Sequence, residues 1–103
     1  MMLTYEKVLE IFKDYLEQDK EIEILVSRRG HVLIEWAGSF DFLDGGRLCS
    51  SPEDLFDALL DSCQGYEEIL LTKGRRELTP EDTQKARAKC LPYLEKRREV
   101  EIG

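Results

Sequence analysis

The chain contains few of the residues that enzymes and metal sites need. It has one histidine, one tryptophan and three cysteines among 103 residues. With a single imidazole, any Ser–His or Cys–His pair would have to use His31, and no pattern places a cysteine beside it. The sequence has no phosphate-binding loop, dinucleotide fingerprint, paired-histidine zinc motif, nucleophile elbow or calcium loop. We therefore expect a non-enzymatic protein with no metal and no cofactor.

Cysteine pairs and long apolar runs are also missing. Cys49, Cys63 and Cys90 form no Cys-x-x-Cys motif, and their odd number and wide spacing favour a reducing cytoplasm over a disulfide framework. No apolar run approaches the roughly 20 residues of a membrane span. The first residues lack the basic-then-apolar pattern of a secretory leader. We expect a cytoplasmic protein that does not contact membranes.

Basic charge is scarce over most of the chain, which carries a net charge of −7. Residues 1–72 hold 6 Lys+Arg and 16 Asp+Glu, a balance of −10, and residues 73–103 hold 9 and 6, a balance of +3. An acidic body repels nucleic acid and anionic membranes, so direct nucleic-acid binding is not expected. The length suits a single domain, residues 1–103.

The spacing of apolar residues predicts an α+β domain. A helix of about four turns is expected after an N-cap at Thr4, and it ends near residue 18. Two segments in which apolar residues alternate, 22–26 and 32–36, predict strands. Helices then follow two further start signals, given below. The expected order is helix, two or three antiparallel strands and two helices, with the helices packed on one face of a small sheet.

Ser51-Pro52 and Thr79-Pro80 are the two later start signals, because a Ser or Thr cap followed by proline is typical of a first helical turn. The first of these helices is expected to continue through Gly65 to about residue 71. In the second, Pro92 should kink the helix or end its regular part. Residues 99–102 alternate, which predicts an edge strand or a frayed end.

The two strand segments also predict a register. If both apolar triplets face the core, Val26 lies opposite Val32, and Arg28-Arg29-Gly30 is a three-residue loop whose glycine has a positive φ. In that register Leu25 and Leu33 lie on the outer face. The inward triplets are Ile22, Ile24 and Val26 on one strand and Val32, Ile34 and Trp36 on the other.

The third strand is left open by the sequence. Phe40 and Phe42 alternate with Asp41, whereas Asp44-Gly45-Gly46 is a strong turn signal. The strand is therefore 40–43, 46–49 or both. If Phe40 and Phe42 are exposed, they mark a partner site, since exposed aromatic residues are typical of interfaces.

Two weak candidates for chemistry come from the strands. His31 would sit at the mouth of the hairpin. A histidine there is more often a solvated turn residue than a catalytic one. Glu23 and Glu35 would lie opposite each other on the outer face, where two like charges raise one pKa or hold a cation. Solvated side chains on an open sheet are the commoner explanation of such a pair.

The stronger expectation is an interaction surface. Leu25, Leu33, Phe40 and Phe42 could form an apolar patch, and Asp57, Asp61 and Glu68 line one side of the helix that begins after Ser51. The first hypothesis is a protein-interaction or regulatory module that binds another protein, including a second copy of itself. The alternative is an acidic mimic of nucleic acid that occupies a basic cleft of a DNA- or RNA-binding protein.

Overall fold

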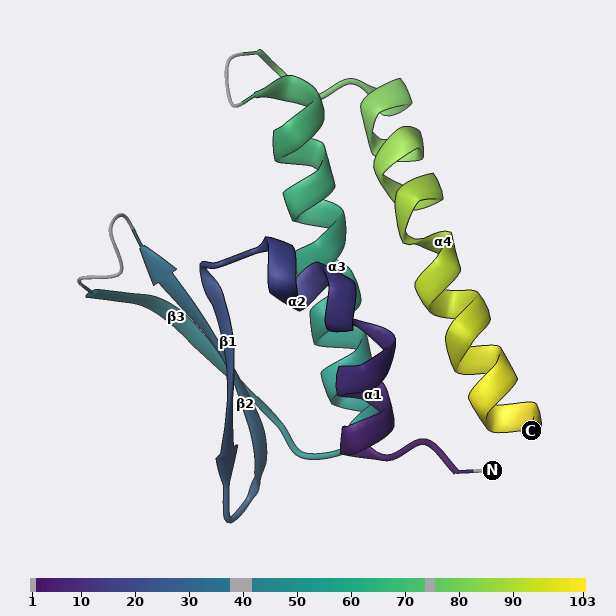
Figure 1. Cartoon of the computed structure of the whole chain (residues 1–103). Helices are drawn as coiled ribbons and strands as arrows, with labels where there is room; N and C mark the ends of the chain where they lie inside the picture. The colour runs from purple at the N-terminus through teal and green to yellow at the C-terminus, as the bar shows by residue number, and fades with distance from the viewer. Residues whose placement is uncertain (1, 38–41, 74–75) are drawn as a thin grey trace.

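Helices and strands follow one another in the order that the sequence predicts (Figure 1). The computed structural model describes residues 2–37, 42–73 and 76–103. Two short helices precede a three-stranded antiparallel sheet of order β1-β2-β3, and two long helices pack against each other and the sheet. The elements are α1 (Tyr5–Ile11), α2 (Lys13–Gln18), β1 (Ile22–Ser27), β2 (Gly30–Ala37), β3 (Phe42–Cys49), α3 (Pro52–Thr72) and α4 (Pro80–Ile102).

Side-chain caps fix the three predicted helix starts. The hydroxyls of Thr4 and Ser51 each accept a hydrogen bond from the backbone N–H three residues later, at 3.2 and 3.1 Å. Thr79 and Asp82 form a reciprocal capping box at the start of α4. A proline occupies the first turn of both long helices, where its missing N–H has no helical partner to lose. All three starts are confirmed.

The N-terminal helix is divided at Phe12. The backbone of Phe12 has φ −94° and ψ 14°, which separates α1 from α2. Hydrogen bonds from Phe12 N–H to Val8 and from Leu16 N–H to Phe12 carry the chain across the break. The Phe12 ring is fully buried and lies close to the rings of Phe56 and Tyr93, with centroids 5.1 and 4.7 Å away. The single helix predicted here is therefore two short helices that are joined at the buried Phe12.

At the C-terminus, α4 is longer than the sequence predicts. It runs through Pro92 to Ile102, so the regular helix does not end at the proline and residues 99–102 are not an edge strand. Proline lacks the N–H that would bond the Ala88 carbonyl. Both residues are exposed, so water can satisfy that carbonyl. The Arg97 guanidinium donates to Glu101 at 2.9 Å within the last turns, which supports the helical end.

The register of β1 and β2 corrects the predicted one. Leu25 lies opposite Val32, and a two-residue turn, Arg28-Arg29, joins the strands. Gly30 belongs to β2 rather than to the loop, although its φ of 136° is positive as expected. A Cβ at this position would clash with the carbonyl oxygen of Cys49 on β3, so only glycine fits.

The new register exchanges the two faces of β2. Leu33, expected on the outer face, is buried in the core among helix residues. Val32, Ile34 and Trp36 alternate with it and lie on the other face of the sheet, where Ile34 is still buried, at 9% exposure. Trp36 is half-buried rather than a core residue. The prediction was wrong because the helices cover the face that carries Leu33 and not the face of the three alternating apolar residues, which alternation along the strand does not reveal.

The third strand spans both of the segments left open by the sequence. β3 is continuous from Phe42 to Cys49, and the Asp44-Gly45-Gly46 signal marks no turn. The pairing changes between Glu35, opposite Gly45, and Trp36, opposite Leu43, which leaves Asp44 as the extra residue of a β-bulge. Phe40 lies outside the described residues.

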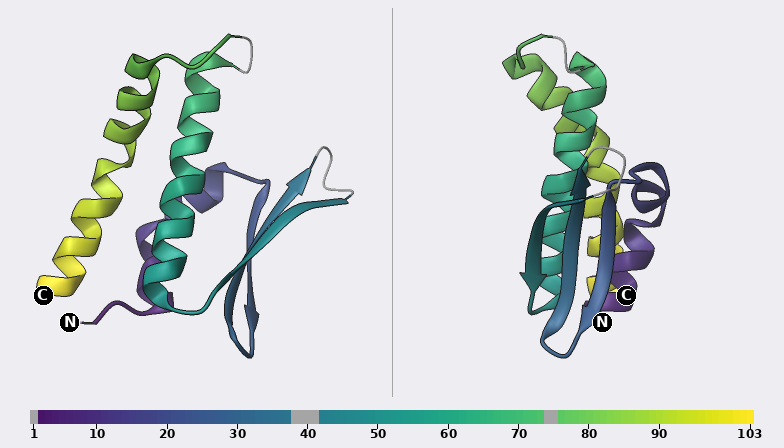
Figure 2. Two further views of the ribbon diagram at one scale, coloured as in Figure 1. Left: turned by 180° about the vertical axis from the view of Figure 1, so that it is seen from behind. Right: turned by 90° about the vertical axis from the view of Figure 1, so that its left-hand side faces the viewer.

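The helices cover one face of the sheet only. In the right-hand view of Figure 2 the sheet lies in front and the helices behind it. The core forms between them, from the apolar sides of α1, α2 and α3 and from a few sheet and α4 residues. Its largest fully buried side chains are Tyr15, Phe12, Phe56, Leu55, Leu59, Val8, Cys49 and Cys63.

Candidate protein-interaction surface

Three aliphatic side chains cross the uncovered face of the sheet in one line. Leu25, Val32 and Leu48 lie directly opposite one another on β1, β2 and β3, and we call them the outer row. Leu25 is 44% exposed and Leu48 is 50% exposed, while Val32 between them is half-buried. Within the described part of the chain, no helix lies over this face (Figure 2). The outer row is therefore apolar surface that the described part of the chain leaves partly exposed.

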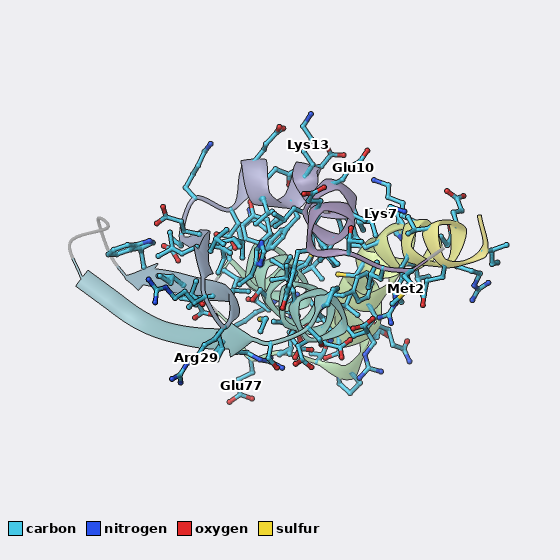
Figure 3. The ribbon with its side chains drawn as sticks, turned by 90° about the horizontal axis from the view of Figure 1, so that it is seen from below. Met2, Lys7, Glu10, Lys13, Arg29 and Glu77 are labelled. Carbon is cyan, nitrogen blue, oxygen red and sulfur yellow. The ribbon has the colours of Figure 1, made fainter. Side chains whose placement is uncertain are left out.

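Opposite charges flank the outer row along the strands. On one side, Glu23 lies across from Ile34 and accepts a hydrogen bond of 2.8 Å from the Trp36 indole N–H. On the other side, the β1–β2 turn carries Arg28 and Arg29, both exposed. Arg29 extends away from the body of the protein at this tip (Figure 3). An apolar centre with a charged rim is the usual anatomy of a protein interface.

The structure keeps one of the four predicted apolar patch residues and adds others. Leu25 is part of the outer row, whereas Leu33 is buried and unavailable to a partner. Phe40 lies outside the described residues, and Phe42 is described only as the first residue of β3. Val32 and Leu48 were missed. A two-residue hairpin turn, had it been assumed, would have placed Leu25 beside Val32 from the sequence alone.

The three predicted acidic residues lie on α3 but do not form an unbroken anionic strip. Asp57 and Asp61 are exposed and Glu68 is half-buried. Arg97 of α4 approaches Asp57 at 4.0 Å, and Arg47 of β3 approaches Asp61 at 3.8 Å. Pairs this long, in which both aspartates are exposed, add little stability. They do place a cation beside two of the acids, which weakens the negative potential there.

A cleft of about 800 Å³ opens where the sheet diverges from α3. The left-hand view of Figure 2 shows the last part of β2 and the first part of β3 leaning away from α3. Gly45 on β3 and Gly65 on α3 both line this opening. A Cβ added to either glycine would meet nothing within 4 Å. The cleft is lined mainly by residues of α2's end, β2, β3 and α3, among them Glu35, Trp36, Arg47, Asp61, Ser62 and Tyr66. Among the described residues that line it there is no histidine or cysteine.

His31 and the two predicted glutamates are placed differently than expected. His31 is not a solvated turn residue: it lies within β2, and its ring stacks on Tyr5 at a centroid distance of 4.0 Å. Glu23 and Glu35 face opposite sides of the sheet, because they pair with Ile34 and Ile22. The proposed carboxylate pair therefore does not form. Among the described residues no group of three or more His, Cys, Asp or Glu side chains could hold a metal ion.

Known proteins give no further guide to the surface. Comparison with family models, with curated proteins and with solved structures finds no match to this chain. None of the described helices combines the length and the apolar character that crossing a bilayer requires.

Proposed function

We propose that this chain is a small cytoplasmic, non-enzymatic protein-interaction or regulatory module. Its partner is another protein, and the partner docks on the outer face of the sheet. The observation that carries the proposal is the outer row itself, in which Leu25, Val32 and Leu48 present aliphatic surface across all three strands.

The energetics of the outer row support this proposal. Burying an aliphatic side chain fully contributes about 1.5–3 kcal/mol, so three such residues can supply the apolar centre of an interface. A sheet is stably covered when a second layer packs on each apolar face. Here the helices form the layer on one face, and a partner would supply the layer on the other.

A matched set of substitutions tests the docking face. Leu25→Glu and Leu48→Glu place a charge in the outer row without touching the core. Val26→Glu is the control, because Val26 is 78% exposed and lies on the same strand but points to the opposite face. Affinity capture from extracts of the source cell, followed by titration of the purified partner, measures binding by each protein.

We expect Leu25→Glu and Leu48→Glu to weaken partner binding by about 2 kcal/mol or more, roughly 30-fold, as at a central interface residue. Val26→Glu should bind as the unaltered protein does. Sedimentation equilibrium of the purified chain detects the case in which the partner is a second copy. Equal binding by Leu48→Glu and Val26→Glu would remove the outer row from the interface.

An acidic mimic of nucleic acid is the alternative function. Its support is the exposure of Asp57 and Asp61 on α3. It is weakened by the two arginines that lie beside them, since a mimic of the phosphate backbone needs uncompensated charge. Under this alternative, Asp57→Asn and Asp61→Asn would reduce binding and the outer-row variants would not.

A further inference from the structure

Two of the three cysteines meet in the interface between the long helices. Cys63 on α3 and Cys90 on α4 are 2% and 3% exposed, and their Sγ atoms are 3.5 Å apart. The third, Cys49, is buried on β3, and its thiol contacts the backbone carbonyl of Arg47 at 3.8 Å. Cys63 and Cys90 are therefore the two cysteines that the packing of α3 on α4 brings into contact.

We propose that Cys63 and Cys90 form a reversible disulfide that ties α4 to α3 when the chain meets a small-molecule disulfide such as oxidised glutathione. A protein disulfide has an S–S bond of about 2.05 Å. The two sulfur atoms are already in van der Waals contact, so rotation of the side chains and a small shift of α4 bring them to bonding distance. This inference is independent of the docking face proposed above.

The exchange chemistry balances in two steps. One thiol of the pair loses its proton, and its thiolate attacks one sulfur of oxidised glutathione; the glutathione S–S bond breaks and one glutathione thiolate leaves. The thiolate of the other cysteine then attacks the protein sulfur of the mixed disulfide and releases the second glutathione. The two protons from the cysteines are taken up by the two glutathione thiolates. The protein loses two hydrogen atoms, and oxidised glutathione is reduced.

Burial protects both thiols while the two long helices stay packed together. It raises the pKa of Cys63 and of Cys90, which holds both thiols protonated and unreactive.

Access to the pair depends on α4, which is held by few buried side chains. Of its 23 residues only Asp82, Ala86 and Cys90 are buried. Transient separation of α4 from α3 exposes the two thiols to the oxidant, and closure then brings the mixed disulfide against the remaining thiol. The resulting cross-link prevents α4 from separating again. Reduction by thiols returns the helix to its weaker attachment.

The experiment uses the whole chain, purified reduced and then incubated under native conditions in defined mixtures of oxidised and reduced glutathione. Intact-mass measurement should show the loss of two hydrogen atoms without an adduct, and peptide mapping should find Cys63 linked to Cys90. The melting temperature of the oxidised protein should rise by several degrees, because the cross-link restricts the unfolded chain. The Cys49→Ala variant should behave in the same way.

Cys63→Ala and Cys90→Ala should gain no protein disulfide and no increase in melting temperature. Mapping of the unaltered chain gives a result even if either variant fails to fold. The proposal is overturned if the native chain keeps all its thiols, or carries only glutathione adducts, under mixtures that oxidise the same chain in urea. A disulfide to Cys49 or between two chains would overturn it equally.

Discussion

At the scale of single residues, Gly30 carries the tightest steric requirement. Its φ is 136°, and a Cβ there would clash with the Cys49 carbonyl oxygen and lie 3.0 Å from the Tyr5 hydroxyl. That hydroxyl also donates to the same carbonyl at 3.0 Å. One glycine therefore allows β2, β3 and α1 to meet at the hairpin end of the sheet.

We expect Gly30→Ala to lower the free energy of unfolding by about 1–3 kcal/mol, because the substitution forces strain at a fixed backbone position. Gly65→Ala is the matched control. Gly65 lies inside α3, and a Cβ there meets nothing within 4 Å, so this change should raise stability by up to about 1 kcal/mol. Urea denaturation of both variants measures the contrast, and equal effects would contradict it.

Asp82 predicts how stability responds to acid. The Arg76 guanidinium holds the Asp82 carboxylate through two bonds, of 2.6 and 2.9 Å, and the Thr79 backbone N–H and hydroxyl also donate to it, at 3.0 and 2.9 Å. These donors, Arg76 first, hold the pKa of Asp82 well below its ordinary value of 3.8. A carboxyl with a lowered pKa in the folded state stabilises the fold above its ordinary pKa. That contribution is lost as the pH falls from this value toward the folded-state pKa.

We expect the melting temperature to fall as the pH drops below about 4, the ordinary range for an Asp carboxyl. Asp82→Asn should lower the melting temperature at neutral pH and flatten its decline in acid. Glu81→Gln, an exposed neighbour in the same helical turn, is the control and should change neither. Thermal melts between neutral pH and pH values below the ordinary Asp pKa measure both effects, and parallel acid profiles for Asp82→Asn and the unaltered chain would exclude this role.

At the scale of elements, the sequence predicts where helices start better than how strands pair. Thr4, Ser51 and Thr79 act through hydrogen bonds to residues three positions away, so a short stretch of sequence contains all the information. The register of β1 and β2 depends instead on which face the distant helices cover. Alternation along β2 fits two registers, and the packing of Leu33 into the core beneath the helices selects between them.

The same distinction explains what was missed at the candidate site. Alternation along β1 places Leu25 on the outer face in both registers, but the residues beside it depend on how β2 and β3 pair. The strand β3 was obscured by Gly45-Gly46, which resembles a turn and is in fact part of an extended strand beside a bulge. Val32 and Leu48 could not be joined to Leu25 until that strand was placed.

For α4, the continuous helix leads to a prediction about Pro92. The proline removes a hydrogen bond from the middle of an exposed helical stretch. Pro92→Ala should therefore raise the free energy of unfolding by about 1–3 kcal/mol, since a proline in a helix interior is that unfavourable relative to alanine. Chemical denaturation followed by circular dichroism provides the measurement. An unchanged or lower stability would show that the helix does not continue through this residue in solution.

At the scale of the whole molecule, charge and apolar surface make different predictions about binding. The chain carries a net charge of −7, yet the outer row has an apolar centre with an acid on one side and arginines on the other. Docking on the outer row should therefore depend weakly on salt, because its main contribution is apolar burial.

We expect the dissociation constant for the partner to change less than about threefold between 0.05 and 0.5 M salt, a range over which the screening length shortens severalfold. The acidic-mimic alternative predicts a loss of a hundredfold or so over a similar range, as in contacts dominated by phosphate-like charge. Titration calorimetry across the series separates the two. The Leu25→Glu and Val26→Glu variants in the same buffers show which surface the salt effect belongs to.

The long helices extend well beyond the rest of the fold, and this has a consequence for how the molecule opens. No residue of α3 between 67 and 71 is buried, whereas most of its core residues lie between 55 and 63 and Tyr66 still packs against Tyr15 of α2. Figure 1 shows this end of α3, and the start of α4 beside it, standing clear of the sheet and the short helices. Amides there should take up deuterium through local fraying, while those near Leu59 exchange only when the whole chain unfolds. The end of α3 and the start of α4 should therefore open locally while the region near Leu59 stays folded.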